Sequence, residues 1–78
     1  MTPSLPVRNG REIIKLLVKH FNCETTMGRG DHVRVHRRIN SVLYASVVQN
    51  TNRDIDRSLL VKILKQLNID RDEFIRVC

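Results

Sequence analysis

Three histidines carry the most versatile side-chain chemistry in this sequence of 78 residues. An imidazole changes its charge near neutral pH, so it can act as an acid, a base or a metal ligand. His32 and His36 lie four residues apart in a segment that alternates polar and apolar residues, as a half-buried β-strand does. Four strand steps span roughly 13 Å, which is too far for two ligands at ~2 Å from one zinc ion. The spacing therefore predicts no metal site and no cofactor.

Two other kinds of catalytic site find no support in the spacing. Asp31 precedes His32 directly, and neighbouring residues on a strand point to opposite faces, so the pair is not expected to form a catalytic dyad. The glycines of residues 28–30 lack the other residues of a phosphate-binding loop. Cys23 and Cys78 form no CxxC pair and no disulfide framework, so we expect two free thiols.

One cluster remains that can carry chemistry. His32, Arg34 and His36 are predicted to share the outward face of a strand, and Arg29 arrives from the preceding turn. A histidine among cations suits RNA cleavage by internal transesterification: a neutral imidazole takes the 2′-hydroxyl proton, the freed oxygen attacks the adjacent phosphorus, and arginines stabilise the developing charge. This scheme needs no metal and excludes DNA, which lacks the 2′-hydroxyl. The alternative is that these exposed side chains are only solvated.

The charge balance also favours a polyanionic partner. The chain has 14 Lys and Arg against 8 Asp and Glu, a formal net charge of +6. Each phosphate that a cation neutralises releases counterions, so we expect RNA as the partner, with an acidic protein as the alternative. Four lysines are candidates for phosphate contacts, or are solvated: Lys15, Lys19, Lys62 and Lys65. No apolar run approaches the ~20 residues of a membrane span and no signal segment opens the chain, which predicts a cytoplasmic location.

Helical periodicity frames the chain at both ends. Residues 1–9 contain both prolines, Pro3 and Pro6, and are predicted to be extended. A helix is predicted over residues 10–21, with Asn9 as its N-cap and His20 near its end, where a cation or a packed ring is usual. Its apolar stripe consists of Ile13, Leu16, Leu17 and Phe21. A second helix follows Asp56 as cap, with Leu59, Leu60, Ile63, Leu64 and Leu67 at helical spacing.

The middle of the chain is predicted to form three strands. They cover residues 22–27, 32–36 and 42–48, separated by turns at 28–30 and 37–41. Val33 and Val35 should face the core. Asn68 should end the second helix, and Asp70 with Glu73 should cap a short terminal helix. The predicted fold is a single α+β domain of order α-β-β-β-α plus a short helix, with one antiparallel sheet, helices on one face and the other face open.

Three segments in matching order resemble the HicA-type toxin family. Residues 5–21 (LPVRNGREIIKLLVKHF) resemble its opening, residues 29–34 resemble its Arg/Lys-Gly-Ser-His signature, and residues 55–74 resemble its second helix and Leu-Lys-Gln motif. The resemblance implies a fold similar to a double-stranded-RNA-binding domain and metal-independent endoribonuclease activity on mRNA, restrained by a HicB-type antitoxin. The family's catalytic histidine corresponds to His32. Gly30 corresponds to the glycine that lets the turn approach the site.

The sequence departs from the family pattern at two positions. Asp31 stands where the family usually has Ser, which places a charge that repels phosphate beside the site. Asn50 replaces a second histidine of the family. These departures keep open a non-catalytic RNA-binding module of the same fold, which would read helical shape and 2′-hydroxyls. A DNA-binding helix-turn-helix over residues 56–67 and 70–77 ranks last, because Asp72 and Glu73 would repel phosphate. An antitoxin is expected to cover the face that bears His32.

Overall fold

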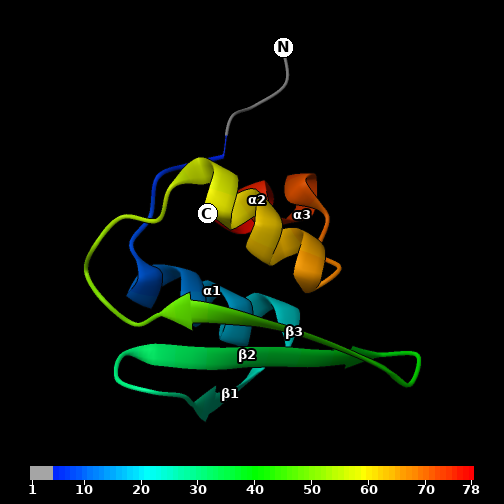
Figure 1. Ribbon diagram of the computed structural model, residues 1–78. Helices are drawn as coiled ribbons and strands as arrows, with labels where there is room; N and C mark the ends of the chain where they lie inside the picture. Colours follow the sequence, from blue (N-terminus) through cyan, green and yellow to red (C-terminus); the bar gives the residue numbers. More distant parts are fainter. Residues whose placement is uncertain (1–4) are drawn as a thin grey trace.

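The six elements follow the predicted order. The structure, a computed structural model, describes residues 5–78, so Pro3 lies outside the described part. Residues 5–8 have no regular structure and lead into the first helix. The elements are α1 (Gly10–Phe21), β1 (Glu24–Met27), β2 (His32–Ile39), β3 (Val42–Gln49), α2 (Arg57–Gln66) and α3 (Arg71–Val77) (Figure 1). The α-β-β-β-α order with a short terminal helix is confirmed.

The strands form one antiparallel sheet in the order β1-β2-β3. The register pairs His32 with Gln49, and Arg34 with Val47 on one side and Thr26 on the other. Paired residues of an antiparallel ladder lie on the same face, so these side chains share one surface. In Figure 1 the helices gather beyond β3, and β1 is the strand farthest from them. The face that carries His32 and Arg34 is left open to solvent.

The second strand is longer than its alternating segment suggested. Residues 37–39, which were predicted as part of a turn, continue β2 as far as Ile39. Arg37 belongs to the inner face, where its guanidinium lies 5.8 Å from the ring centroid of Phe21. The strand continues because residues 37–39 pair with residues 42–44 of β3, and the cation–π contact gives the charged Arg37 a partner on the inner face. The turn itself is Asn40 and Ser41, whose φ angles of 50° and 68° suit a tight hairpin.

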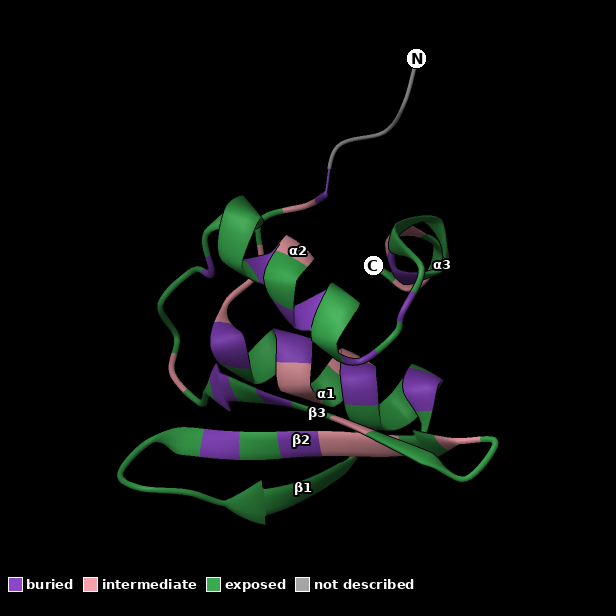
Figure 2. Cartoon of the chain, turned by 45° about the vertical axis from the view of Figure 1, so that its right-hand side comes forward, coloured by how far each residue is buried: buried purple, intermediate pink, exposed green. Residues whose placement is uncertain are grey.

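The core lies between the inner face of the sheet and the three helices. Val33 and Val35 are buried, which confirms their predicted direction. Phe21 of α1 and Phe74 of α3 stack with their ring centroids 6.0 Å apart. The other fully or largely buried side chains include Ile13, Leu17, Val48, Leu60, Ile63, Leu64 and Leu67. Figure 2 shows these buried stretches where α1 faces the sheet and α2. Leu59, predicted in the same stripe, is 47% exposed and lies outside the core.

Local capping explains where most helices begin and end. The side chains of Asn9 and Asp70 each accept a hydrogen bond from the backbone N–H three residues later, as predicted. Asn68 has a φ of 55°, which confirms the left-handed stop after α2. Asp56 differs, because its carboxylate accepts a hydrogen bond from the Ser58 hydroxyl and caps no backbone N–H. That hydrogen bond lowers the pKa of Asp56 below its ordinary value.

The start of α1 rests directly on the end of β3. A Cβ placed on Gly10 would lie 1.8 Å from the backbone oxygen of Gln49. The amide of Gly10 donates to the Arg53 carbonyl at 3.2 Å, and the amide of Arg11 donates to the Thr51 carbonyl at 3.1 Å. Two N–H groups in the first turn of α1, which have no partner within the helix, are thus bonded to carbonyls of the loop after β3. This packing fixes Gln49, the strand partner of His32.

Candidate functional site

His32 is held in place by a turn with several backbone hydrogen bonds. It is the first residue of β2, and its side chain is 50% exposed on the open face of the sheet. The Gly28 amide donates to the His32 carbonyl at 2.9 Å, and the His32 amide donates to the Arg29 carbonyl at 3.0 Å. The Asn50 amide donates to the Asp31 carbonyl at 2.7 Å, which ties the turn to the loop after β3. The backbone around His32 is therefore well fixed.

A hydrogen bond of the His32 side chain sets which nitrogen of the imidazole carries the hydrogen. His32 Nδ1 lies 3.3 Å from the Arg29 carbonyl oxygen. A carbonyl oxygen only accepts, so Nδ1 carries the hydrogen in this bond. In the neutral ring Nε2 then bears the lone pair. The geometry leaves His32 with an Nε2 that can take a proton from a bound molecule.

Asp31 lies beside the ring, contrary to the sequence prediction. Its Oδ1 is 3.7 Å from His32 Nδ1, and both side chains are about half exposed. The prediction assumed that both residues belong to a strand, where neighbours point to opposite faces. Asp31 belongs to the turn instead, so its side chain is free to lie on the same side as the imidazole. The carboxylate places a negative charge beside the site, which opposes an approaching phosphate.

The two glycines of the turn serve different purposes. Gly30 has a φ of 58°, a left-handed conformation that L side chains rarely adopt, and a Cβ there would meet no atom within 4 Å. A Cβ on Gly28 would lie 2.7 Å from the His32 carbonyl oxygen. Gly28 therefore allows the turn to pack closely on the backbone of His32. Gly30 is required by the conformation of the turn.

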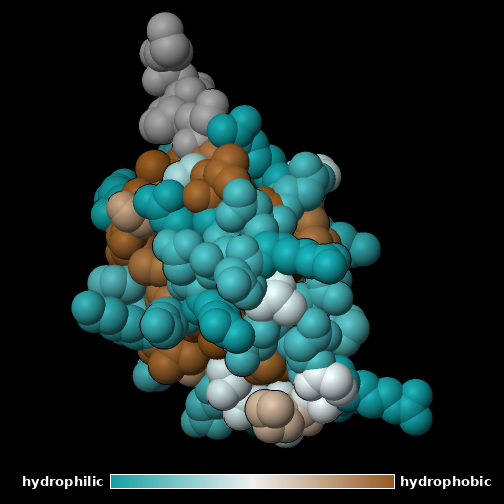
Figure 3. Space-filling view, turned by 90° about the vertical axis from the view of Figure 1, so that its left-hand side faces the viewer, coloured by the Kyte–Doolittle hydropathy of each residue, from teal (hydrophilic) through white to brown (hydrophobic). Residues whose placement is uncertain are grey.

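The structure brings the predicted open-face residues together. Arg34 is exposed two residues after His32 on the same face of β2. His36 is half-buried, and its Nε2 lies 3.2 Å from the Thr26 hydroxyl across the sheet, so its ring is engaged in a cross-strand hydrogen bond. Arg29 is exposed in the turn. Figure 3 views the end of the molecule where this turn lies, and hydrophilic side chains cover most of that face.

The four lysines divide between two parts of the surface. Lys62 of α2 lines a groove together with Arg34. Lys65 is exposed on the same helix. Lys15 lines a separate depression with Arg8 and with Cys78 at the end of α3, and Lys19 is exposed on α1. The structure therefore brings Lys62 near the open-face cluster and places the α1 lysines in the helical layer.

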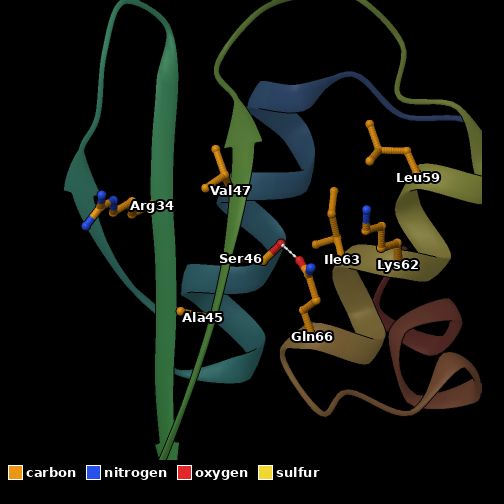
Figure 4. A pocket seen from close by; sticks show the side chains of 8 residues that line it. All are labelled: Arg34, Ala45, Ser46, Val47, Leu59, Lys62, Ile63 and Gln66. Atoms are coloured by element: carbon orange, nitrogen blue, oxygen red, sulfur yellow. Dashed lines mark hydrogen bonds between the residues drawn. The ribbon is translucent and has the colours of Figure 1, made fainter.

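The groove between β3 and α2 was not predicted from the sequence. It has a volume of about 540 Å³ and is lined by Arg34, by residues 45–47 and by Leu59, Lys62, Ile63 and Gln66 of α2 (Figure 4). The Ser46 hydroxyl donates to Gln66 Oε1 at 2.6 Å across its floor. An adjoining hollow of about 280 Å³ contains His32 and shares Val47, Leu59 and Ile63 with the groove. The lining residues come from distant segments, and Leu59 fits the apolar stripe of its helix by spacing, so nothing in the sequence indicated the groove.

Other chemistry-bearing groups are placed away from this surface. Cys23 is buried and Cys78 exposed, and both thiols are free, as predicted. Burial raises the pKa of the Cys23 thiol, so it stays protonated at neutral pH.

Within residues 5–78, no three His, Cys, Asp or Glu side chains gather in a way that could hold a metal ion. No helix of that described stretch is long and apolar enough to cross a membrane.

Comparison with known proteins gives one match. Residues 10–69 match the family described as HicA toxin of bacterial toxin–antitoxin systems. No curated protein and no solved structure matched the chain. The matched segment runs from the first residue of α1 to the end of the turn after α2, so it includes the whole sheet and the His32 turn. The chain therefore belongs to the HicA family of toxins from bacterial toxin–antitoxin systems.

Proposed function

We propose that this toxin is a metal-independent endoribonuclease that cleaves mRNA with His32 as its general base. The observation that carries the proposal is the hydrogen bond from His32 Nδ1 to the Arg29 carbonyl, which leaves Nε2 available on an open, cationic face. A general base needs a free lone pair within reach of the proton it removes. Family membership supports the same reading, since these toxins are known as mRNA interferases.

The reaction follows from the chemistry of RNA itself. His32 Nε2 takes the proton of a 2′-hydroxyl, and the 2′-oxygen attacks the adjacent phosphorus. The bond from phosphorus to the 5′-oxygen of the next nucleotide breaks, and that oxygen takes up a proton from the imidazolium or from water. The products are a 2′,3′-cyclic phosphate and a 5′-hydroxyl. Arg29 and Arg34 stabilise the negative charge that builds on the phosphoryl oxygens.

The remaining basic residues are proposed as contacts along the RNA backbone. Gly30 leaves the turn beside His32 free of side-chain bulk, and His36 lies farther along the same face of β2. Lys62 and Lys65 extend this surface along α2. Lys15 and Lys19 would contact a more distant part of a longer RNA, because they are exposed on α1 and line neither the groove nor the hollow that contains His32. Contacts of this kind position RNA without reading its bases.

A non-catalytic RNA-binding module is the second candidate. The observation that favours it is the Asp31 carboxylate, whose Oδ1 lies 3.7 Å from His32 Nδ1 and puts a negative charge beside the site. The two candidates differ in one observable, which is whether bound RNA is cut. Incubation of the purified protein with mRNA in EDTA, beside DNA of the same sequence, decides between them. Cleavage of the RNA alone supports the ribonuclease, and intact RNA that is bound but uncut supports the binding module.

Substitution of Asp31 by asparagine is expected to tighten RNA binding by up to about fivefold, since an exposed charge interaction is worth roughly 0.2–1 kcal/mol. The carboxylate is half exposed and removal of its charge leaves the turn backbone unchanged. Fluorescence anisotropy with a labelled RNA at fixed salt concentration measures the effect. Asp72→Asn on α3 removes the same charge far from the open face and should change affinity much less. Weaker binding by Asp31→Asn would contradict a repulsive role for this carboxylate.

Membership in a toxin–antitoxin family also implies an antitoxin partner. We propose that a HicB-type antitoxin covers the open face that bears His32, because that position blocks RNA from the general base. A structure of the complex in which this face stays open to solvent would contradict the proposal.

A further inference from the structure

We propose that the groove between β3 and α2 binds the base of the nucleotide next to the cleaved phosphate. The inference rests on the proposed function and adds to it a subsite for one unstacked base of single-stranded RNA. Base recognition in RNA generally targets unstacked bases that can be splayed out of the strand. The groove would therefore restrict cleavage to unpaired regions of an mRNA.

The groove is continuous with the hollow that contains His32. The hollow that contains His32 and the groove share three lining residues, Val47, Leu59 and Ile63. In the sheet register Val47 pairs with Arg34, and Gln49 pairs with His32. The two pairs are one same-face step apart, roughly 7 Å along the strand. A nucleotide with its phosphate beside His32 could therefore reach the groove with its base.

The walls of the groove have the chemistry that a base requires. Val47 and Leu59 stand on opposite walls and are 48% and 47% exposed, with Ile63 between them (Figure 4). Bases removed from a stack are commonly held between apolar side chains and read by hydrogen bonds at their edges. At the floor, Gln66 Oε1 accepts from Ser46, so the amide nitrogen of Gln66 remains to donate to a carbonyl or ring nitrogen of the base.

Charge at the rim favours a nucleotide over a protein segment. Arg34 on β2 and Lys62 on α2 flank the groove, and no acidic residue is among the residues that line it. Two cations at the mouth of an apolar slot match a base with phosphates on either side of it. The outer edge of β3 could instead accept a strand of a protein partner, and the experiment below separates that outcome.

The test measures binding of short single-stranded RNAs in which one nucleotide at a time lacks its base. Each RNA carries a 2′-deoxy nucleotide at the cleavage position, so it binds without being cut. The variant is Leu59→Gln, which removes an exposed apolar wall of the groove. The matched control is Val18→Gln, because Val18 is 46% exposed on α1, outside the groove. Fluorescence anisotropy gives the affinity of each pair of protein and RNA.

We expect the affinity for RNA to fall roughly 10-fold when one particular base is absent, and to fall only slightly when a base at another position is absent. Leu59→Gln should show a similar loss with the intact RNA and no further loss with that abasic RNA. Val18→Gln should behave like the parent protein. The sensitive position should lie within one nucleotide of the bond that is cut in the matching all-ribose RNA.

Three results would overturn the proposal. The first is equal affinity of the protein for every abasic RNA. The second is that the losses of affinity from Leu59→Gln and from base removal add when the two changes are combined. The third is that Leu59→Gln weakens the binding of a HicB-type antitoxin and leaves RNA binding unchanged. The last result would assign the groove to a protein. Because the RNA is not cut in this assay, the subsite and the proposed catalysis fail separately. If removal of one base lowers the affinity but the all-ribose RNA is not cut, the subsite is supported and the ribonuclease activity is contradicted. If the all-ribose RNA is cut but no base affects the affinity, the activity is supported and the subsite is contradicted.

Discussion

Replacement of His32 by alanine is expected to lower the rate of RNA cleavage about 10²- to 10⁴-fold, the range that a positioned general acid or base contributes. The loss arises because no other side chain near this position offers a held imidazole with a free Nε2. The His32 side chain is half exposed and outside the core, so the variant should fold like the parent. Its affinity for an uncleavable RNA should change little.

His36→Ala provides the matched control for this prediction. The second histidine lies on the same strand, but its Nε2 is engaged with the Thr26 hydroxyl at 3.2 Å. Its removal should therefore lower cleavage far less than removal of His32. Initial rates on a labelled mRNA in EDTA measure both variants. Retained activity in His32→Ala, or a larger loss in His36→Ala, would contradict the assignment of His32.

The largest effect on stability is expected for Gly10→Ala, at about 3 kcal/mol, the upper end of the usual cost of overpacking. The added Cβ would lie 1.8 Å from the Gln49 backbone oxygen, so the first turn of α1 must move away from β3. That movement would also weaken the hydrogen bonds from Gly10 and Arg11 to the loop. Because Gln49 pairs with His32, the site should loosen as well. Urea unfolding followed by circular dichroism measures the change in free energy.

Gly30→Ala is the control for glycine loss as such. A Cβ at Gly30 meets nothing within 4 Å, so its cost comes only from the φ of 58° and should be roughly 1–2 kcal/mol. A Gly10→Ala variant as stable as Gly30→Ala would show that α1 and β3 can separate without penalty. That result would contradict the view that this contact fixes the end of the sheet.

The parts of the fold that depend on local pattern could be predicted from the sequence. The apolar spacing and the Asn9 cap predict residues 10–21 as a helix, and α1 has these bounds. Strict alternation predicted that Val33 and Val35 face the core and that His32 faces out. Periodicities of 3.6 and 2 residues are properties of neighbouring residues, so one sequence is enough to reveal them.

Features that depend on contacts between distant residues could not be predicted. Residues 37–39 extend β2 by pairing with residues 42–44 of β3, and Arg37 packs on Phe21 across the fold. The approach of Asp31 to His32 depends on where the turn ends and the strand begins, which the alternation does not specify. Leu59 fits the apolar stripe by spacing, but in the fold it is 47% exposed and lines the groove between α2 and β3.

The sequence predicted the residue types of the candidate site but only part of its geometry. The sequence indicated a histidine among cations on one strand face, and the structure places His32 and Arg34 there. It did not indicate the Arg29 carbonyl that sets the tautomer, because a backbone oxygen leaves no sign in residue identity. The groove beside His32 was also missed, since its walls come from β3 and α2.

The chemistry of the cleaved ends shows whether the 2′-hydroxyl of the RNA is the attacking group. An RNA with one ribose among 2′-deoxy nucleotides, incubated with the protein in EDTA, offers a single bond that internal transesterification can break. Mass spectrometry of the fragments identifies the new ends. We expect cutting only after the ribose, with a 2′,3′-cyclic phosphate on one fragment and a 5′-hydroxyl on the other. Fragments with a 3′-hydroxyl and a 5′-phosphate, or cutting at the deoxy positions, would contradict a mechanism in which His32 activates the 2′-hydroxyl.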